Sequence, residues 1–440
     1  MPITEKEPGL SRPASGARVL TVLPDFPFPA TTGLHLRHLG NLELVHRLGC
    51  FSALLYFSTE EREPLPVEST PLARICDEVR HGGRRFPHGD FSTVSLIFHK
   101  ADFLLRGALG IPGKRYPFSM SYDRIGAEEI ILAEAQRVKA EFVILPSMFM
   151  HYTAELQPQR FRVIVDAADV LSMLSASFIE LDGRGGRLGL YANHLACRTQ
   201  ERVFLRKASE LWTTSAVEAD QFRRIAPETR VLVIPNSLDE QVLPRTPAGS
   251  QPIVGFIGTY SYAPNLQSAS FLAQQVFPRV LAECPDATLR IAGANMPDFA
   301  TAKLKLLPRI ELHGQVADSG CFMDECAVVA LPVFLRGGVP LKLVEAMARG
   351  KAIVASPQLV SGVDITDGEN ALIRTKPEDF ASAIVLLLRN TPLREQLGRN
   401  ARATFERDFS LSTAEATLRR DSVLMQRVSS ASHRKDLIPQ

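Results

Sequence analysis

The stretch LRGGVPLKLVEAMARGKAIVAS, residues 335–356, says more about the fold of this chain than any other. Pro340 suits the first position of a helix, and Gly350 suits the position just beyond the end of one. Together they predict a helix over about 340–349. The run AIVAS that follows is short and apolar, as is typical of a buried strand. The stretch therefore predicts one helix-to-strand unit of a parallel sheet.

The start of this predicted helix is suited to bind an anion, because its unpaired N–H groups and its dipole are positive there. Lys342, in the first turn, works against that field unless an anion neutralises both. Gly337 and Gly338 would let backbone N–H groups approach a phosphate, and Glu345 is placed to accept hydrogen bonds from hydroxyls, as on a ribose. The alternative is a surface Lys–Glu pair worth a few tenths of a kcal/mol. Taken alone, the stretch leaves both interpretations open.

Apolar runs of strand length recur on both sides of this stretch, with amphipathic helices between them. In the second half of the chain they are PIVGFIG (252–258), ATLRIAG (287–293), RIELHG (309–314), VVALPVF (328–334), AIVAS (352–356) and NALIR (370–374). In the first half they are RVLTVLP (18–24), FSALLYF (51–57), EFVILPS (141–147), RFRVIVDA (160–167), ELWTTS (210–215) and VLVIPN (231–236). Residues 58–140 are less regular and are expected to be mostly helical. Apolar strands that alternate with helices indicate an α/β chain with two parallel sheets, each covered on both faces.

A chain of 440 residues is long enough for two or three domains. Pro, Gly and Ser residues mark the boundaries. The expected units are a disordered N-terminus (1–16), an N-terminal domain (17–236), a linker (237–251), a C-terminal domain (252–405), a C-terminal helix that returns to the N-terminal domain (406–425) and a flexible tail (426–440).

Composition argues against several classes of protein. A formal net charge of +2 is nearly neutral, which argues against nucleic acid as the main partner. The six cysteines are scattered without CxxC spacing or a histidine cluster, so we expect free thiols and no metal site. The N-terminus lacks the pattern of a signal peptide, and no apolar run approaches the roughly 20 residues of a membrane helix. We therefore expect a cytoplasmic protein.

Glycines follow several of the expected strands. Gly258, Gly293 and Gly314 come directly after a strand, and Gly337 and Gly338 follow shortly after another. Because ligands of open parallel sheets bind beyond the carboxyl ends of the strands, these five glycines would leave room for a ligand along one edge. Glycine is also common in any tight turn. The pattern therefore favours a cleft without identifying what binds there.

Several motifs occur together in the order of a known family. They are VIPNSLD (233–239), GFIGTYSYAPN (255–265), IELHGQVAD (310–318), RGGVPLKLVEAMARGKAIVAS (336–356) and REQLGRNARATFERDFS (394–410). Their sequence closely resembles the retaining GT-B glycosyltransferases of the large glycosyl transferases group 1 family, nearest to the bacterial exopolysaccharide-type branch. The resemblance covers about 230–410 strongly and the N-terminal half more weakly. It implies two Rossmann-like parallel-sheet domains that face each other across a cleft, with a nucleotide-sugar donor bound mainly by the second.

The resemblance also implies donor-binding roles. Glu345 would bind the ribose, and Lys342, helped by Arg336, would face the diphosphate. The remaining implied contacts are backbone of Gly337, Gly338, Val339 and Pro340 beside the phosphates and donor sugar, Gly258 and Thr259 on the phosphate side, Val316 near the base, and Gly33 in an N-terminal loop that closes over the donor.

The sequence departs from the family at three functional positions. The basic residue that usually follows the first strand of the donor domain is absent from GTYSYAPN (258–265), which leaves Lys342 and Arg336 as the cations. An acidic residue eight positions before the ribose glutamate is common in the family, and Gly337 stands there. The histidine of many relatives is replaced by Ala168, beside Asp166 and Asp169. With Lys342, these two aspartates and His151 are the catalytic candidates. As alternatives, DAAD (166–169) also fits a helix N-cap, and His151 also fits a packed or surface histidine.

We therefore expect a hexosyl- or other glycosyltransferase that acts with retention, without metal or cofactor, in polysaccharide or glycoconjugate synthesis. Its acceptor would be a saccharide or a lipid-linked saccharide. The arginines of 184–207 read as a solvated face, with contact at the inner face of a membrane as the alternative. A nucleotide-sugar epimerase and a non-catalytic binding protein of the same fold also stay open. A dinucleotide-dependent dehydrogenase is disfavoured because no G-x-G-x-x-G follows the first strand of either domain.

Overall fold

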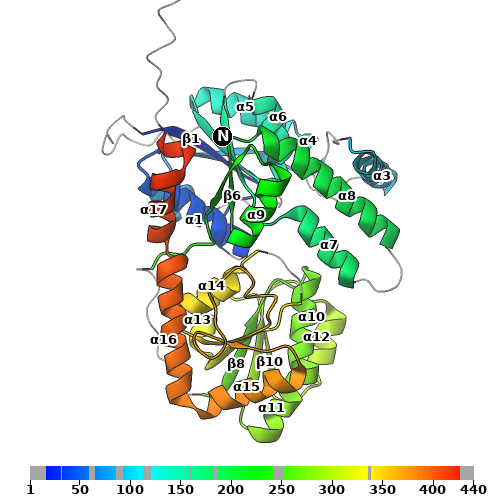
Figure 1. Cartoon of the computed structure of the whole chain (residues 1–440), viewed down its shortest axis with the longest axis vertical. Coiled ribbons are helices and arrows are strands. Elements are labelled where there is room, and N and C mark those ends of the chain that lie inside the picture. The colour runs from blue at the N-terminus through cyan, green and yellow to red at the C-terminus, as the bar shows by residue number, and fades with distance from the viewer. Residues whose placement is uncertain are drawn as a thin grey trace, which may run out of the picture.

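The computed structural model describes residues 16–30, 32–58, 65–85, 93–111, 120–157, 161–181, 187–240, 251–334 and 338–426. The chain forms two domains, each built on one parallel sheet with helices on both faces (Figure 1). The predicted architecture, two Rossmann-like parallel-sheet domains, is therefore confirmed.

The sheet of the N-terminal domain has seven strands in the order β3-β2-β1-β4-β5-β6-β7, and every pair is parallel. The strands are β1 Arg18–Leu23, β2 Phe51–Ser58, β3 Glu78–Arg84, β4 Phe142–Pro146, β5 Arg162–Asp166, β6 Glu210–Thr213 and β7 Arg230–Val233. The main helices are α1 Gly33–Arg47, α3 Thr93–Ala108, α5 Ala127–Arg137, α7 Leu171–Leu181, α8 Arg187–Phe204 and α9 Ala216–Ile225, with the short α2 Leu72–Ile75, α4 Met120–Asp123 and α6 Thr153–Leu156. Leu20 and Val22 of β1 pack into a core on one face of the sheet, and Val19 packs into the core on the other.

The sheet of the C-terminal domain has six strands in the order β10-β9-β8-β11-β12-β13, again all parallel. The strands are β8 Ile253–Ile257, β9 Thr288–Ala292, β10 Ile310–Gly314, β11 Val328–Leu331, β12 Ala352–Ala355 and β13 Leu372–Ile373. The helices are α10 Ala263–Phe271, α11 Phe277–Glu283, α12 Asp298–Lys305, α13 Ser319–Asp324, α14 Leu341–Ala348, α15 Pro377–Arg389 and α16 Thr391–Asp408. The helix predicted over about 340–349 is α14, which begins after Pro340 and ends before Gly350.

One strand departs from the sequence prediction. Residues 58–140 were expected to be mostly helical, but β3 lies among them and pairs with β2 at the edge of the first sheet. Its sequence, EVRHGGR, is polar and contains two glycines. An edge strand has only one neighbour and keeps much of its surface in water, so it lacks the apolar run by which the central strands are recognised.

The last helix, α17 Leu411–Asp421, leaves the C-terminal domain and packs against the N-terminal one (Figure 1, red). Leu411 and Leu418 join the same core cluster as Val19 of β1. The buried carboxylate of Glu210 accepts hydrogen bonds from the Ser422 hydroxyl (2.7 Å) and the Val423 N–H (2.9 Å). The C-terminal segment therefore ties the two domains together. Within the described residues, no helix combines the length and the apolar character needed to cross a bilayer.

Candidate functional site

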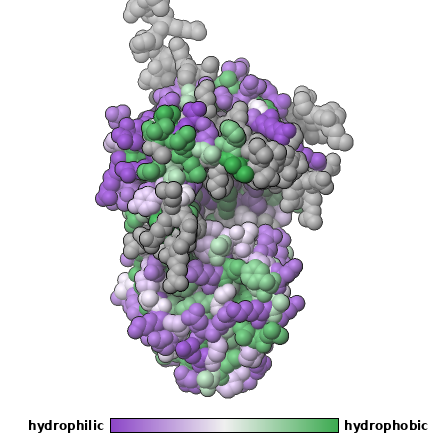
Figure 2. All heavy atoms as spheres, turned by 90° about the vertical axis from the view of Figure 1, so that its right-hand side faces the viewer, coloured by the Kyte–Doolittle hydropathy of each residue, from purple (hydrophilic) through white to green (hydrophobic). Residues whose placement is uncertain are grey.

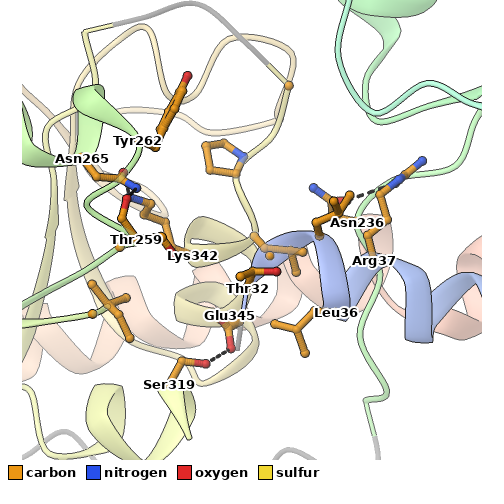
Figure 3. Close-up of a pocket in the computed structure, with 18 of the residues that line it drawn as sticks. Thr32, Leu36, Arg37, Asn236, Thr259, Tyr262, Asn265, Ser319, Lys342 and Glu345 are labelled. Carbon is orange, nitrogen blue, oxygen red and sulfur yellow. Dashed lines mark hydrogen bonds between the residues drawn. The ribbon is translucent and has the colours of Figure 1, made fainter. Parts of the chain in front are cut away.

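A cavity of about 420 Å³ lies between the two domains at the carboxyl ends of their strands. Its volume falls within the usual range for small-molecule sites. The surface of the molecule recedes between the domains (Figure 2), and Figure 3 shows side chains from both of them at the cavity. The N-terminal domain contributes Thr32, Gly33, Arg37, Ala168, Asp169 and Asn236, and the C-terminal domain contributes Gly258, Thr259, Asn265, Val316, Ser319, Gly338, Val339, Pro340, Lys342 and Glu345, among others.

Lys342 brings a positive charge to the start of α14. Its Nζ donates a hydrogen bond to Oδ1 of Asn265 (2.7 Å) and lies 4.7 Å from the ring centroid of Phe256. Burial lowers the pKa of Lys342 to about 7, because water is largely excluded around the amine. Within the described residues Lys342 forms no ion pair. An ammonium group without a counter-charge, beside a helix N-terminus, is a place where a bound anion would be strongly stabilised.

Glu345 lies one turn further along α14 and faces another part of the same cavity (Figure 3). Its Oε1 accepts a hydrogen bond from the hydroxyl of Ser319 (2.5 Å), at the start of α13. Burial raises the pKa of the Glu345 carboxyl. Ser319 is the only described residue whose side chain donates to this carboxylate. The second oxygen, Oε2, is thus left to accept hydrogen bonds from hydroxyl groups of a ligand.

Glycine is required where the first two strands of the C-terminal domain end. A Cβ on Gly258 would lie 2.7 Å from Cγ of Asn265, the residue that holds the Lys342 amine. A Cβ on Gly293 would lie 1.8 Å from the carbonyl oxygen of Gly258, and Gly293 has a φ of +136°. The two turns therefore lie in close contact. A side chain on Gly258 would displace Asn265 from Lys342, and one on Gly293 would clash with the backbone of Gly258.

Most of the predicted donor-side residues meet at this cavity. The residues that line it are Gly33, Gly258, Thr259, Val316, Gly338, Val339, Pro340, Lys342 and Glu345. Arg336 and Gly337 lie outside the described residues. Gly338 differs from the prediction in one respect. Its N–H, expected to face a phosphate, instead donates to Oδ1 of Asp169 in the opposite domain (2.9 Å).

The predicted acceptor-side residues do not lie together at the cavity. Asp169 lines the cavity, whereas Asp166 and His151 do not. Asp166 is buried, and its carboxylate forms an ion pair with the guanidinium of Arg37, whose Nε donates to Oδ1 at 3.0 Å. His151 is buried against Tyr152, and its Nε2 lies 3.3 Å from Oδ1 of Asp123. The structure therefore brings neither side chain to a place where it could touch a ligand in this cavity.

Several polar residues that line the cavity were not predicted, among them Arg37, Asn236, Asn265 and Ser319. Asn236 and Asn265 lie within quoted motifs, VIPNSLD and GFIGTYSYAPN, but nothing in the spacing of either motif distinguishes the asparagine. Ser319 follows Asp318, whose carboxylate accepts from the N–H groups of Gly320 and Cys321. An aspartate in the N-cap position is a local signal that could have placed a helix start near Ser319.

Residues 251–390 match the model of the family described as glycosyl transferases group 1. This match covers most of the C-terminal domain. A protein of Methanocaldococcus jannaschii described as an uncharacterized glycosyltransferase is 36% identical over 76 residues. The aligned segment is 17% of this chain and spans only 19% of the length of that relative.

Solved structures resemble the chain over nearly its whole length. Sucrose-phosphate synthase from Thermosynechococcus elongatus has a TM-score of 0.65 at 15% identity, over 92% of this chain and 98% of that one. A mutant of S. aureus TarM, in complex with Fondaparinux, alpha-GlcNAc-glycerol and UDP, has a TM-score of 0.66 at 10% identity, over 93% and 100%. Anabaena HepE, with UDP and glucose, has a TM-score of 0.57 at 15% identity, over 91% and 98%. The predicted GT-B fold is therefore confirmed.

Proposed function

We propose that the protein is a glycosyltransferase that moves a sugar from a nucleotide-diphosphate sugar to a hydroxyl group of an acceptor, with retention at the anomeric carbon. The acceptor would be a saccharide or a lipid-linked saccharide of polysaccharide or glycoconjugate synthesis. One observation carries the proposal. Lys342, which has no counter-charge among the described residues, and Glu345, with one oxygen held by Ser319, line a single cavity at the start of α14.

This arrangement supplies what the leaving group needs. As the bond between the anomeric carbon and the phosphate oxygen breaks, negative charge grows on the diphosphate. A fixed ammonium and a helix N-terminus stabilise that charge without rearranging during the reaction. The positive charge thus comes from Lys342 and α14, so the proposed step requires no metal ion.

Retention follows if the acceptor hydroxyl attacks the anomeric carbon from the face that the diphosphate leaves. The new C–O bond then forms on that face, and the hydroxyl proton passes to the departing phosphate oxygen. Such a reaction needs no separate protein base. The cavity is consistent with this, since Asp169 and Glu345 are the only carboxylates among its described lining residues and no histidine lines it. An epimerase would need a fuller set of acids and bases, which makes that alternative less favoured.

The test is a panel of UDP-, GDP- and ADP-sugars, read by thermal shift and by slow hydrolysis of the donor. UDP-glucose and UDP-GlcNAc come first, because structures of HepE and TarM contain UDP. We expect one donor to raise the melting temperature, since a ligand that binds the native state stabilises it. The same donor should be hydrolysed slowly without acceptor. Binding without hydrolysis, even with saccharide acceptors added, would support a non-catalytic binding protein, and no binding would contradict the proposal.

We further propose that α3 and α8 of the N-terminal domain contact an anionic membrane surface. On α3, Phe98 is 74% exposed and Leu105 is exposed on the same face, seven residues on. Leu109, in the turn that follows α3, is exposed as well. On α8, which packs against α3, the stripe Tyr191, Leu195, Arg198 and Arg202 is exposed. Figure 2 views this side of the molecule and shows apolar side chains on the upper domain. An exposed apolar stripe that continues into arginines is typical of helices that lie in a bilayer interface.

This membrane contact is tested by co-sedimentation with lipid vesicles. We expect the protein to bind vesicles that contain anionic phosphatidylglycerol and to bind neutral phosphatidylcholine vesicles weakly. Phe98→Glu should weaken binding at least about tenfold, because it places a charge where an apolar ring is buried in lipid. Phe299→Glu is the matched control, since Phe299 is 72% exposed on α12 of the other domain. Equal loss in both variants, or no preference for anionic vesicles, would contradict the proposal.

A further inference from the structure

We propose that Asp166 and Asp169 are positioning residues, through which the N-terminal domain holds Gly338 and Val339 in place at the donor side of the cavity. Their importance for catalysis rests on the function proposed above. The contacts themselves do not depend on it. The inference changes the role of both aspartates from direct participants in sugar transfer to supports of the segment that leads into α14.

Asp169 acts directly. It follows β5 by three residues, and its Oδ1 accepts the N–H of Gly338 from the opposite domain at 2.9 Å. A charged acceptor makes this hydrogen bond stronger than one between neutral groups. The backbone of Gly338 is therefore fixed against the N-terminal domain.

Asp166 acts through two other residues. Arg37 of α1 donates from Nε to both carboxylate oxygens of Asp166 (3.0 and 3.1 Å) and from Nη1 to Oδ1 of Asn236 (3.0 Å). Because an arginine has donors only, it fixes the side-chain oxygen of Asn236 toward itself and turns the amide nitrogen away. That nitrogen, Nδ2, donates to the carbonyl oxygen of Val339 at 2.6 Å. The chain of contacts thus runs from β5 through α1 to Val339, and Figure 3 shows Arg37 and Asn236 beside the cavity.

Gly338 also lies in close contact with the N-terminal domain. A Cβ there would lie 2.7 Å from the hydroxyl oxygen of Thr214, 2.8 Å from the carbonyl oxygen of Ala168 and 3.0 Å from Oδ1 of Asp169. All three atoms belong to the N-terminal domain. Gly338 is thus enclosed by the opposite domain, and only a residue without a side chain allows its N–H to reach Asp169.

The held segment is also the one that places the proposed chemistry. Pro340 is the N-cap residue of α14, so Val339 and Gly338 lead directly into the helix that carries Lys342 and Glu345. A shift of about 1 Å at a reacting group can cost about 10²-fold in rate. Two hydrogen bonds to consecutive residues just before α14 therefore couple the position of its first turn to the N-terminal domain.

The test compares Asp169→Ala with Asp169→Asn. Both remove the charge, but the asparagine keeps an oxygen that can accept the Gly338 N–H. Without any ligand, hydrogen–deuterium exchange of the Gly338 amide should be at least about tenfold faster in Asp169→Ala, and Asp169→Asn should recover most of this loss. Asn236→Ala should also speed exchange, because it frees the Val339 carbonyl. Asp220→Ala is the control. Asp220 is exposed on α9 of the same domain, and its carboxylate pairs with Arg223 (2.7 Å) rather than with Gly338 or Val339.

A kinetic comparison then separates positioning from direct catalysis. On the donor that the wild type hydrolyses, kcat/KM should fall about tenfold or more in Asp169→Ala and be largely restored in Asp169→Asn. If the asparagine variant is as inactive as the alanine variant while its Gly338 amide stays protected, the carboxylate charge acts on substrate and the proposal is wrong. Unchanged exchange in Asp169→Ala would overturn it as well. Failure of the wild type to process any donor would contradict the proposed function alone, since exchange needs no nucleotide.

Discussion

Replacing Lys342 with methionine is expected to lower the turnover of the donor sugar roughly 10²–10³-fold, the usual loss when one fixed group that stabilises a developing anion is removed. Methionine has a similar length and is apolar, so the partly buried position should accept it, and the protein should fold at least as well without an isolated ammonium. The measurement is kcat for donor hydrolysis and for transfer. Lys303→Met, on the exposed surface of α12 in the same domain, is the control. A Lys342→Met variant with wild-type kcat would remove Lys342 from the mechanism.

The same variant should also change the pH dependence of nucleotide binding. The pKa of Lys342 is about 7 in the free protein, so the amine is mostly neutral above pH 7. A diphosphate favours the protonated amine, and binding above pH 7 must therefore take up a proton. The affinity of the wild type for UDP should fall by up to about tenfold per pH unit above 7, until the pKa of the bound state is reached. Lys342→Met should bind weakly and lose this slope. Calorimetric titration of both proteins with UDP from pH 7 to 9 would measure this slope, and an equal slope in both would contradict the prediction.

The donor side of the site could be predicted from the sequence because its signals are local. Pro340 and Gly350 bracket α14, so the spacing of Lys342 and Glu345 on that helix follows from a few adjacent residues. The carboxyl ends of β8 and β9 could be placed in the same way, because each is a short apolar run followed by a glycine. When a site is built at the start of one helix, the local sequence is enough to predict most of its residues.

The opposite side could not be predicted, because its contacts join residues far apart in the chain. Asp166 meets Arg37 across 129 positions, and Asp169 meets Gly338 across 169. DAAD after a strand is compatible with a catalytic group, with a helix cap and with an ion pair, and only the partner distinguishes them. His151 shows the same limit, since its burial against Tyr152 has no signature in the sequence.

Replacing Glu345 with alanine should weaken nucleotide-sugar binding by about 1–3 kcal/mol, the scale of a lost hydrogen bond to a charged group. The folded protein should tolerate the change, since burial already raises the pKa of this carboxyl and its removal eliminates a partly buried charge. Glu378→Ala, at an exposed position of α15, is the control. Unchanged affinity in Glu345→Ala would contradict its assignment to the donor.

The assignment to the ribose can be tested more sharply with deoxynucleotides. If Oε2 of Glu345 accepts from a ribose hydroxyl, wild type should bind UDP more tightly than either 2′-deoxy-UDP or 3′-deoxy-UDP, according to which hydroxyl it contacts. In Glu345→Ala the same comparison should show little difference, because the hydroxyl has already lost its partner. The double-mutant cycle then measures the contact itself rather than the general effect of removing a carboxylate. Additive losses would mean that Glu345 and the ribose do not touch, and that the part of the cavity next to Ser319 binds another portion of the donor.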